Sequence, residues 1–165
     1  MLEFVAGTWY LVPGIHRVSL EEMRSVFVES APYSEEREEV FDAFRLWRAK
    51  LLRLTPTAQL WVNGGFVTHK PWAPPKDVDV VARVVGRELD ALEPEAQNEF
   101  EGLMTIPASD VHPRIQPIAG LVDGFYSRRS EPDKTIVWRD TWATVLDQNR
   151  AVVPGAQKGF LEVTR

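Results

Sequence analysis

The sequence contains no cysteine, which excludes disulfide bonds, thiolate catalysis and zinc–thiolate sites. It also has no apolar run close to the roughly 20 residues that a membrane-spanning helix needs. Its first residues lack the basic start and the long apolar stretch of a secretory signal. We therefore expect a cytoplasmic protein with no membrane partner.

An excess of positive charge is lacking as well, because the formal net charge is −5. Domains that bind duplex nucleic acid are normally basic, so any contact with nucleic acid would have to be local. A small anionic ligand held through a metal ion fits this charge better, because the metal supplies the positive potential. The histidines His16, His69 and His112 have no partner at metal-ligand spacing.

The length of 165 residues predicts a single domain over residues 1–165. We expect its N-terminal part, about residues 19–54, to be helical. Ser19 and Glu22 have the spacing of a capping box, which predicts a helix to about Glu29. A second helix over residues 34–53 follows from apolar residues at steps of three and four: Val40, Phe41, Phe44, Trp47, Leu51 and Leu54.

The rest of the chain contains several short candidate strands. Residues 1–18 are expected to be an extended lead-in, and residues 134–146 fit either a strand or a helix. The other predictions are strands at 60–62, 78–85, 115–126 and 158–163, a loop at 70–76, and a helix at 88–101 that begins or breaks near Pro94.

The most informative segment joins a sharp turn to a pair of acids. Gly64-Gly65 follows the strand at 60–62, and glycine enters positive φ freely. Asp77 and Asp79 stand at the start of the β-branched strand, where alternation places both carboxylates on one face. Carboxylates this close repel each other unless a cation lies between them. They suit Mg²⁺ (or Mn²⁺), which prefers hard oxygen ligands and is shared with phosphates, and the turn exposes backbone N–H groups to a triphosphate.

This arrangement resembles the nucleotidyltransferase superfamily, the DNA polymerase β-like fold. Its pattern is a strand, Gly-Ser, about a dozen residues, and then D-x-D on the next strand. The run at residues 61–68 with Lys70-Pro71, and the C-terminal run at 157–163, also look like small bacterial and phage proteins called nucleotidyltransferase-like. The resemblance implies an α/β (α+β) fold with a mixed sheet and packed helices. It also implies transfer of a nucleoside monophosphate from a nucleoside triphosphate, with loss of pyrophosphate.

The chain departs from that pattern at Gly65, where the superfamily has a serine that contacts a phosphate. Backbone donors would have to replace this contact. Active members also have a third carboxylate on a later strand, which completes the metal site and can accept the proton of the attacking hydroxyl. Asp123 and Asp110 are the candidates. We favour Asp123, because a strand fixes geometry better than a loop does, although Asp123 could also be a turn residue before Gly124.

Weaker candidates surround this segment. Lys70 and Lys76 could contact phosphates, although solvated loop lysines are more common. Thr68 could supply a hydroxyl or simply be a strand former. Lys158 reaches the site only if the last strand neighbours it.

We therefore predict a metal-dependent nucleotidyltransferase acting on an RNA, protein or small-molecule hydroxyl, and the phage-like resemblance implies a toxin or phage-defence role. The alternative is a catalytically inactive protein of the same fold that binds a nucleotide or a protein. A plain interaction module that uses the six tryptophans at an interface is a third class.

Overall fold

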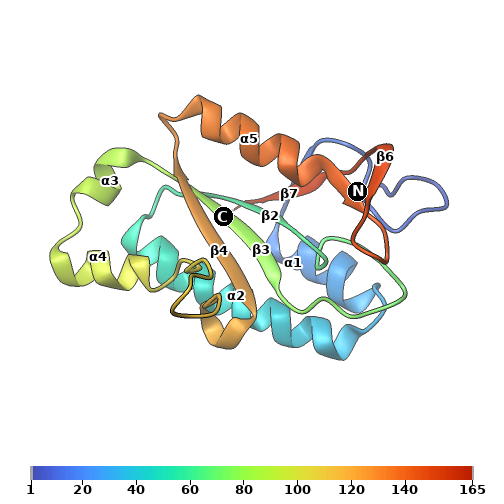
Figure 1. Cartoon of the computed structure of the whole chain (residues 1–165), viewed down its shortest axis with the longest axis horizontal. Coiled ribbons are helices and arrows are strands. Elements are labelled where there is room, and N and C mark those ends of the chain that lie inside the picture. Colours follow the sequence, from blue (N-terminus) through green and yellow to red (C-terminus); the bar gives the residue numbers. More distant parts are fainter. Residues whose placement is uncertain (1, 165) are drawn as a thin grey trace.

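A mixed five-stranded sheet forms the centre of an α+β fold in the computed structural model, which describes residues 2–164 (Figure 1). The strand order is β1-β7-β2-β3-β4. β2 is antiparallel to both β3 and β7, whereas β1 and β7, and likewise β3 and β4, are parallel. The strands are β1 (Ile15–Val18), β2 (Gln59–Asn63), β3 (Val78–Val84), β4 (Val122–Arg128) and β7 (Phe160–Val163).

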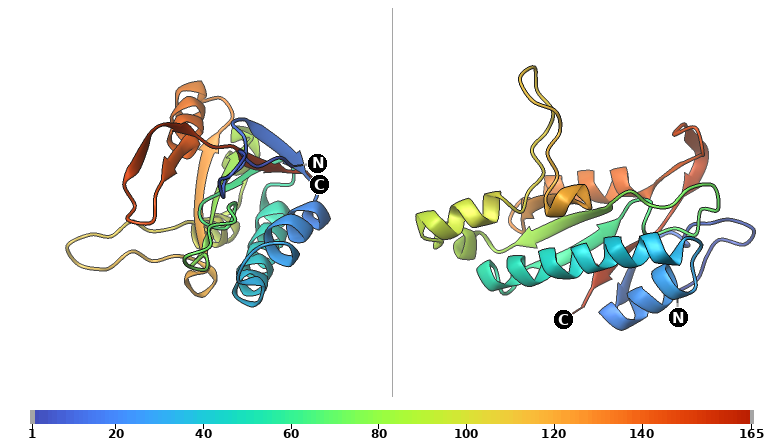
Figure 2. Two further views of the ribbon diagram at one scale, coloured as in Figure 1. Left: turned by 90° about the vertical axis from the view of Figure 1, so that its right-hand side faces the viewer. Right: turned by 90° about the horizontal axis from the view of Figure 1, so that it is seen from below.

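One face of the sheet carries the larger core and is covered by α2 (Ser34–Leu54), with α1 (Leu20–Arg24) and the π-helical turn η1 (Ser25–Glu29) beside it (Figures 1 and 2). The predicted apolar stripe of α2 is buried against the sheet, where Phe44 and Trp47 are fully covered. The capping interaction at the start of α1 is also present, because the Ser19 hydroxyl accepts from the backbone N–H of Glu22 at 3.0 Å. Both predicted N-terminal helices are thus confirmed.

The opposite face carries α5 (Pro132–Ala143) and a smaller apolar cluster. Trp61, Val81, Trp142 and Phe160 are buried there, and Trp138 packs against them. Two short strands, β5 (Thr144–Leu146) and β6 (Val152–Gln157), pair with each other after α5. The remaining elements are α3 (Gly86–Asp90), α4 (Pro94–Glu101) and the 3₁₀ turn η2 (Ile118–Gly120).

The structure corrects one predicted boundary and refines two others. The expected lead-in contains β1, a four-residue strand with His16 and Arg17 at its centre, which pairs with β7. The expected strand at 115–126 begins only at Val122, since residues 118–120 form a 3₁₀ turn with positive φ at Ile118 and Ala119. The ambiguous segment at 134–146 is α5 followed by β5.

The other elements appear near their predicted places. The helix predicted at 88–101 is two helices, with α4 starting at Pro94. The strands predicted at 60–62, 78–85 and 158–163 correspond to β2, β3 and β7. None of the helices within residues 2–164 combines the length and the apolar character that crossing a membrane requires.

Candidate functional site

Three neighbouring strands bring polar side chains to one end of the sheet. In the pairing register, Asn63 on β2 lies beside Asp79 on β3, and Asp79 lies beside Asp123 on β4. Val78 and Val80 pack into the core on the α2 face. Because side chains alternate across a strand, Asp79 faces the α5 side. The sheet therefore places two acids and an amide in one row.

Asp77 is the residue immediately before β3. Of the two acids, only Asp79 therefore lies within the strand. The carboxylate of Asp77 nevertheless acts on the same site. The pKa of Asp79 is raised to about 7, first by burial and then by the negative charges of Asp77 and Asp123. Lys158 and Arg114 act in the opposite direction. Three acids therefore interact at the start of β3 and β4.

A cavity of about 540 Å³ opens over these acids, a size typical of small-molecule and cofactor sites. Its lining includes all the residues that we proposed for metal or substrate binding. The charged side chains of the lining are the acids Asp77, Asp79, Asp123 and Asp147 and the bases Lys70, Lys76, Arg114, Arg150 and Lys158. Although the chain as a whole is acidic, bases thus outnumber acids around the cavity by five to four.

The glycine turn touches the central acid. Gly64 has a φ of 80°, and a Cβ atom at this position would lie 1.7 Å from Oδ2 of Asp79. Any side chain at position 64 would therefore collide with the acid and strain the backbone. Asp79 can occupy its place only because residue 64 is glycine.

The second glycine of the turn is covered by a cation. A Cβ atom at Gly65 would lie 2.9 Å from the Nζ atom of Lys70. The nearest group above position 65 is thus a flexible ammonium. Burial, followed by the charge of Arg37, lowers the pKa of Lys70, and Asp77 acts against this shift. The ammonium of Lys70 therefore lies over the glycine turn, inside the lining of the cavity.

Thr68 and Lys76 have different places in the same wall. The Thr68 hydroxyl donates to the carbonyl of Gly65 at 2.8 Å, so it braces the turn from within. The guanidinium of Arg37, which is fully buried, donates to the carbonyls of Phe66 and Thr68 at 2.8 and 2.6 Å. Lys76 is exposed at the rim of the cavity. Thr68 and Arg37 therefore hold the shape of the turn, whereas Lys76 is free to approach a ligand.

Lys158 lies between β6 and β7, and its side chain reaches the site. Its Nζ atom donates to Oδ1 of Asn63 at 2.9 Å, and the Asn63 amide donates to the carbonyl of Trp142 at 2.9 Å. Burial lowers the pKa of Lys158 to about 8, and the charge of Asp79 acts against this shift. The condition for Lys158 to reach the site is met, because β7 pairs with β2.

A loop over residues 106–115 adds a guanidinium to the acids. Its ends are joined by backbone hydrogen bonds between Ile106 and Ile115 of 2.9 and 3.0 Å. The loop extends away from the rest of the molecule (Figure 2, right), and Asp110 lies on it, exposed and outside the cavity lining. The structure thus brings Asp123, and not Asp110, to Asp77 and Asp79.

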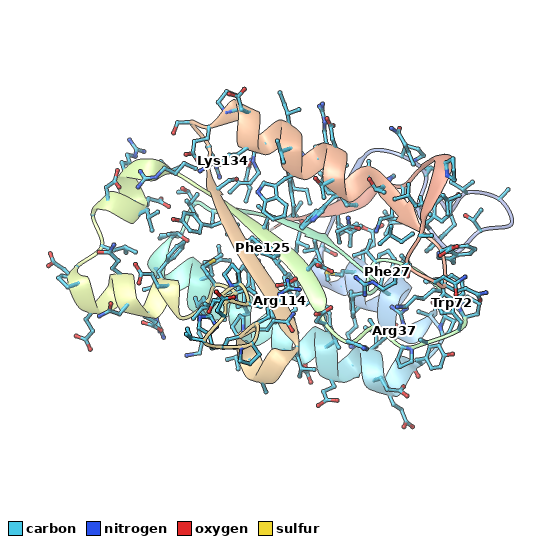
Figure 3. All side chains as sticks on the ribbon, in the orientation of Figure 1. Phe27, Arg37, Trp72, Arg114, Phe125 and Lys134 are labelled. Carbon is cyan, nitrogen blue, oxygen red and sulfur yellow. The ribbon has the colours of Figure 1, made fainter. Side chains whose placement is uncertain are left out.

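Arg114 of this loop forms an ion pair with Oδ2 of Asp123, and Figure 3 shows it beside β4. Gln116 donates to Oδ2 of Asp77 at 2.7 Å. The other oxygen of Asp123, Oδ1, is buried and has no hydrogen-bond partner. A buried oxygen without a partner is costly, so Asp123 still has one oxygen available to a ligand.

The donor chemistry of these acids fits a hard divalent cation, since three carboxylates and an unpartnered oxygen meet in one cavity. Within residues 2–164, however, no group of three or more His, Asp or Glu side chains is already arranged to hold a metal ion. Arg114 and Gln116 engage two of the three carboxylates. Each contact occupies one carboxylate oxygen, Oδ2 of Asp123 and Oδ2 of Asp77, so a metal at all three acids would use their other oxygens or displace these contacts.

Several residues at or beside the cavity have no recognisable signal in the sequence or only a weak one. Asn63 belongs to the glycine-turn motif, and its amide could have been noticed there. Arg114 and Arg150 line the cavity and Gln116 donates to Asp77, but all three lie in loops without a motif, so only the structure reveals their contacts. The positions of Trp9 and Trp72 in the lining were likewise not predictable from spacing.

Comparisons with known proteins place the chain in a family but do not add a function. No curated protein matches the chain, and no solved structure matches it. One family model, described as a family of unknown function (DUF6932), matches residues 2–164. Since this match spans all of the residues that the structure describes, the chain belongs to the DUF6932 family.

Proposed function

We propose that this protein is a metal-dependent nucleotidyltransferase, which moves a nucleoside monophosphate from a nucleoside triphosphate to a hydroxyl group. The observation that carries the proposal is the convergence of Asp77, Asp79 and Asp123 in one cavity beside a glycine turn. The resemblance of the Gly64-Gly65 and Asp77-Val78-Asp79 pattern to the nucleotidyltransferase superfamily supports it independently. The acceptor would be an RNA, a protein or a small molecule.

In such a site, the acids would bind the metal and the groups at the glycine turn would contact the phosphates. Asp77, Asp79 and Oδ1 of Asp123 would hold Mg²⁺ or Mn²⁺. When bound, the metal would neutralise triphosphate oxygens and help to position the phosphates. The ammonium of Lys70 over Gly65 would contact the β- or γ-phosphate. Lys158, which is partly buried and interacts with the charge of Asp79, would balance the negative charge that gathers there.

In the transfer itself, the acceptor oxygen forms a bond to the α-phosphorus. The bond between this phosphorus and the oxygen bridging to the β-phosphate breaks, and pyrophosphate leaves. The proton of the hydroxyl passes to the carboxylate of Asp123. This step requires Asp123 to exchange its contact with Arg114 for one with the acceptor, so the Arg114–Asp123 pair must open during each cycle.

A catalytically inactive nucleotide-binding protein is the second candidate, and one contact favours it. The guanidinium of Arg114 already neutralises Asp123, and an acid held in an ion pair is a poor proton acceptor. Gly65 in place of serine also removes a phosphate contact of the superfamily. In this case Asp77 and Asp79 would hold a metal–triphosphate complex without transfer.

Calorimetric titration with each nucleoside triphosphate, with and without Mg²⁺, tests the binding that both candidates share. We expect metal-dependent binding to the wild-type protein and none to the double variant Asp77→Ala with Asp79→Ala. The matched control, Asp110→Ala, removes an exposed acid outside the cavity and should leave binding unchanged. Equal affinity in the wild-type protein and the double variant would show that these acids are not the site.

Asp123→Asn separates the two candidates. The asparagine keeps the size of the side chain but cannot accept the proton, so we expect pyrophosphate release to fall strongly while triphosphate binding persists. Release is measured with labelled triphosphate in the presence of mixed RNA and protein acceptors. Binding without release in the wild-type protein itself would favour the inactive module.

A further inference from the structure

Two tryptophans form an aromatic wall of the cavity, distant in sequence from the acids. Trp9 precedes β1 and Trp72 lies in the loop before β3, and both line the cavity. Their ring centroids are 4.6 Å apart at an angle of 81°, an edge-to-face contact that aromatic pairs favour. Trp72 remains 36% exposed. Part of its ring surface is therefore available to a ligand in the cavity.

The wall is fixed to the glycine turn by backbone contacts. The N–H of His69 donates to the carbonyl of Trp9 at 2.7 Å, and Tyr10 forms an isolated antiparallel bridge with Thr68. Thr68 in turn donates to Gly65. Because Trp9 is connected to the turn through these few contacts, the distance between ring and turn is set by the fold, as a preorganised binding site requires.

The loop that carries Trp72 is held from the other side. The Tyr33 hydroxyl, at the start of α2, donates to the carbonyl of Pro71 at 2.6 Å. Pro74 and Pro75 follow in the cavity lining, and proline restricts the backbone. Trp72 is therefore presented by a stiff loop. Figure 3 shows it near the end of the molecule where that loop lies, away from Arg114.

The cavity thus combines three kinds of group. The acids lie at the start of β3 and β4, the ammonium of Lys70 lies over Gly65, and the tryptophans lie on the segments joined to that turn. A ligand that matches them carries a metal-binding anionic group at one end and a flat, aromatic group at the other. Stacking on an aromatic side chain accepts any base, because every base has a π-face.

We propose that Trp9 and Trp72 form the subsite for the nucleobase of the bound nucleoside triphosphate, with Trp72 as the stacking platform. This inference rests on the proposed function, because it assumes that the triphosphate binds beside the acids. The sheet order favours the base of the triphosphate over a base of the acceptor. The tryptophans join the turn after β2, whereas Asp123, which would receive the acceptor's proton, lies on β4 across β3.

Three probes titrated in the presence of Mg²⁺ test this assignment: ATP, inorganic tripolyphosphate, and a short single-stranded RNA with a 5′ hydroxyl. We expect the wild-type protein to bind ATP roughly tenfold more tightly than tripolyphosphate, as one stacked base contributes. Trp72→Ala should remove this preference and leave the affinity for tripolyphosphate unchanged. Trp72→Phe should keep part of it. The control Tyr126→Ala removes an exposed aromatic side chain outside the cavity and should keep all of it.

Fluorescence gives a second readout that needs no alanine variant. Stacking of ATP on Trp72 should quench the tryptophan emission of the wild-type protein more than that of Trp72→Phe, whereas tripolyphosphate should quench neither. Circular dichroism checks that each variant is folded.

The outcomes distinguish this inference from the proposed function. If tripolyphosphate binds but Trp72→Ala leaves the affinity for ATP unchanged, the subsite is overturned and the metal–phosphate site stands. If the RNA alone loses affinity in Trp72→Ala, the stacked base belongs to the acceptor, which also overturns the assignment. If neither ATP nor tripolyphosphate binds to the wild-type protein with Mg²⁺, the proposed function fails and the inference fails with it.

Discussion

The two faces of the sheet use the same strands for different purposes. Along β3, Val78, Val80 and Val84 are fully buried in the core under α2. On the opposite face, Val81 alone belongs to the small core under α5, and Asp79 lies in the cavity. A face that is completely packed provides stability, and the face with the smaller core leaves room for polar groups. Because its side chains alternate between the two faces, β3 contributes to the stable core on one side and carries an electrostatically unfavourable acid on the other.

The largest effect should come from breaking the α2 face. Phe44→Ala removes a fully buried ring and should lower the free energy of unfolding by about 3–5 kcal/mol. Trp138→Ala removes a partly buried ring that packs against the small cluster under α5, and it should cost roughly 1–2 kcal/mol. Urea denaturation followed by circular dichroism measures both values. Equal losses would show that the packing on the α5 face stabilises the fold as much as the packing on the α2 face.

The next effect concerns Asp79 and has the opposite sign. Its pKa in the folded protein is raised to about 7, above the ordinary value of 3.8. The folded state therefore holds the proton more tightly than the unfolded state, and stability falls as the pH rises from about 4 to 7. Without metal, Asp79→Asn should be more stable than the wild-type protein at pH 8, by on the order of 2–4 kcal/mol.

Near pH 4 this difference should disappear, because Asp79 is then protonated in both states. Thermal denaturation in a chelator at the two pH values measures it. A wild-type protein whose stability relative to Asp79→Asn does not change with pH would mean that Asp79 is solvated and that the α5 face does not hold an unfavourable charge.

A smaller effect should follow from opening the Arg114–Asp123 pair. Arg114→Ala frees Oδ2 of Asp123 and should raise the affinity for Mn²⁺ alone roughly threefold to tenfold, since a partly exposed ion pair is a modest competitor. Calorimetric titration gives the affinity. The control is Arg128→Ala, which breaks a pair with Asp90 away from the cavity. Weaker binding in Arg114→Ala would mean that Arg114 supports the metal site.

The smallest effect belongs to Asp110. This residue is exposed on the 106–115 loop, so Asp110→Asn should change the free energy of unfolding by no more than about 0.5 kcal/mol. It should also leave Mg²⁺-dependent nucleotide binding unchanged. A clear loss of binding in this variant would show that the loop folds back over the acids when a ligand is present.

The sequence predicted those parts of the fold that depend on local periodicity. The apolar stripe of α2 repeats every three to four residues, and β3 is rich in β-branched valine, so both elements were recognisable from the sequence. β1 was not, because Ile15–Val18 includes His16 and Arg17 and becomes a strand only through its pairing with β7. α5 was ambiguous, because its polar and apolar residues are not separated into faces.

The site was predictable to the same extent. Alternation predicted that Asp77 and Asp79 lie together, and the preference for a strand pointed to Asp123, which lines the cavity, whereas Asp110 does not. The register that aligns Asn63 with Asp79, and the contact of Lys158 with Asn63 across 95 positions of the chain, depend on tertiary pairing. The contact of Arg114 with Asp123 depends on the course of a loop, which no sequence spacing specifies.

A crystal structure with Mn²⁺ and a non-hydrolysable nucleoside triphosphate tests the central claim most directly, because manganese is located by its anomalous scattering. We predict a manganese peak within about 2.1–2.2 Å of carboxylate oxygens of both Asp77 and Asp79, with the triphosphate over the Gly64-Gly65 turn. A manganese ion bound elsewhere, or a triphosphate bound without metal at these acids, would contradict the account.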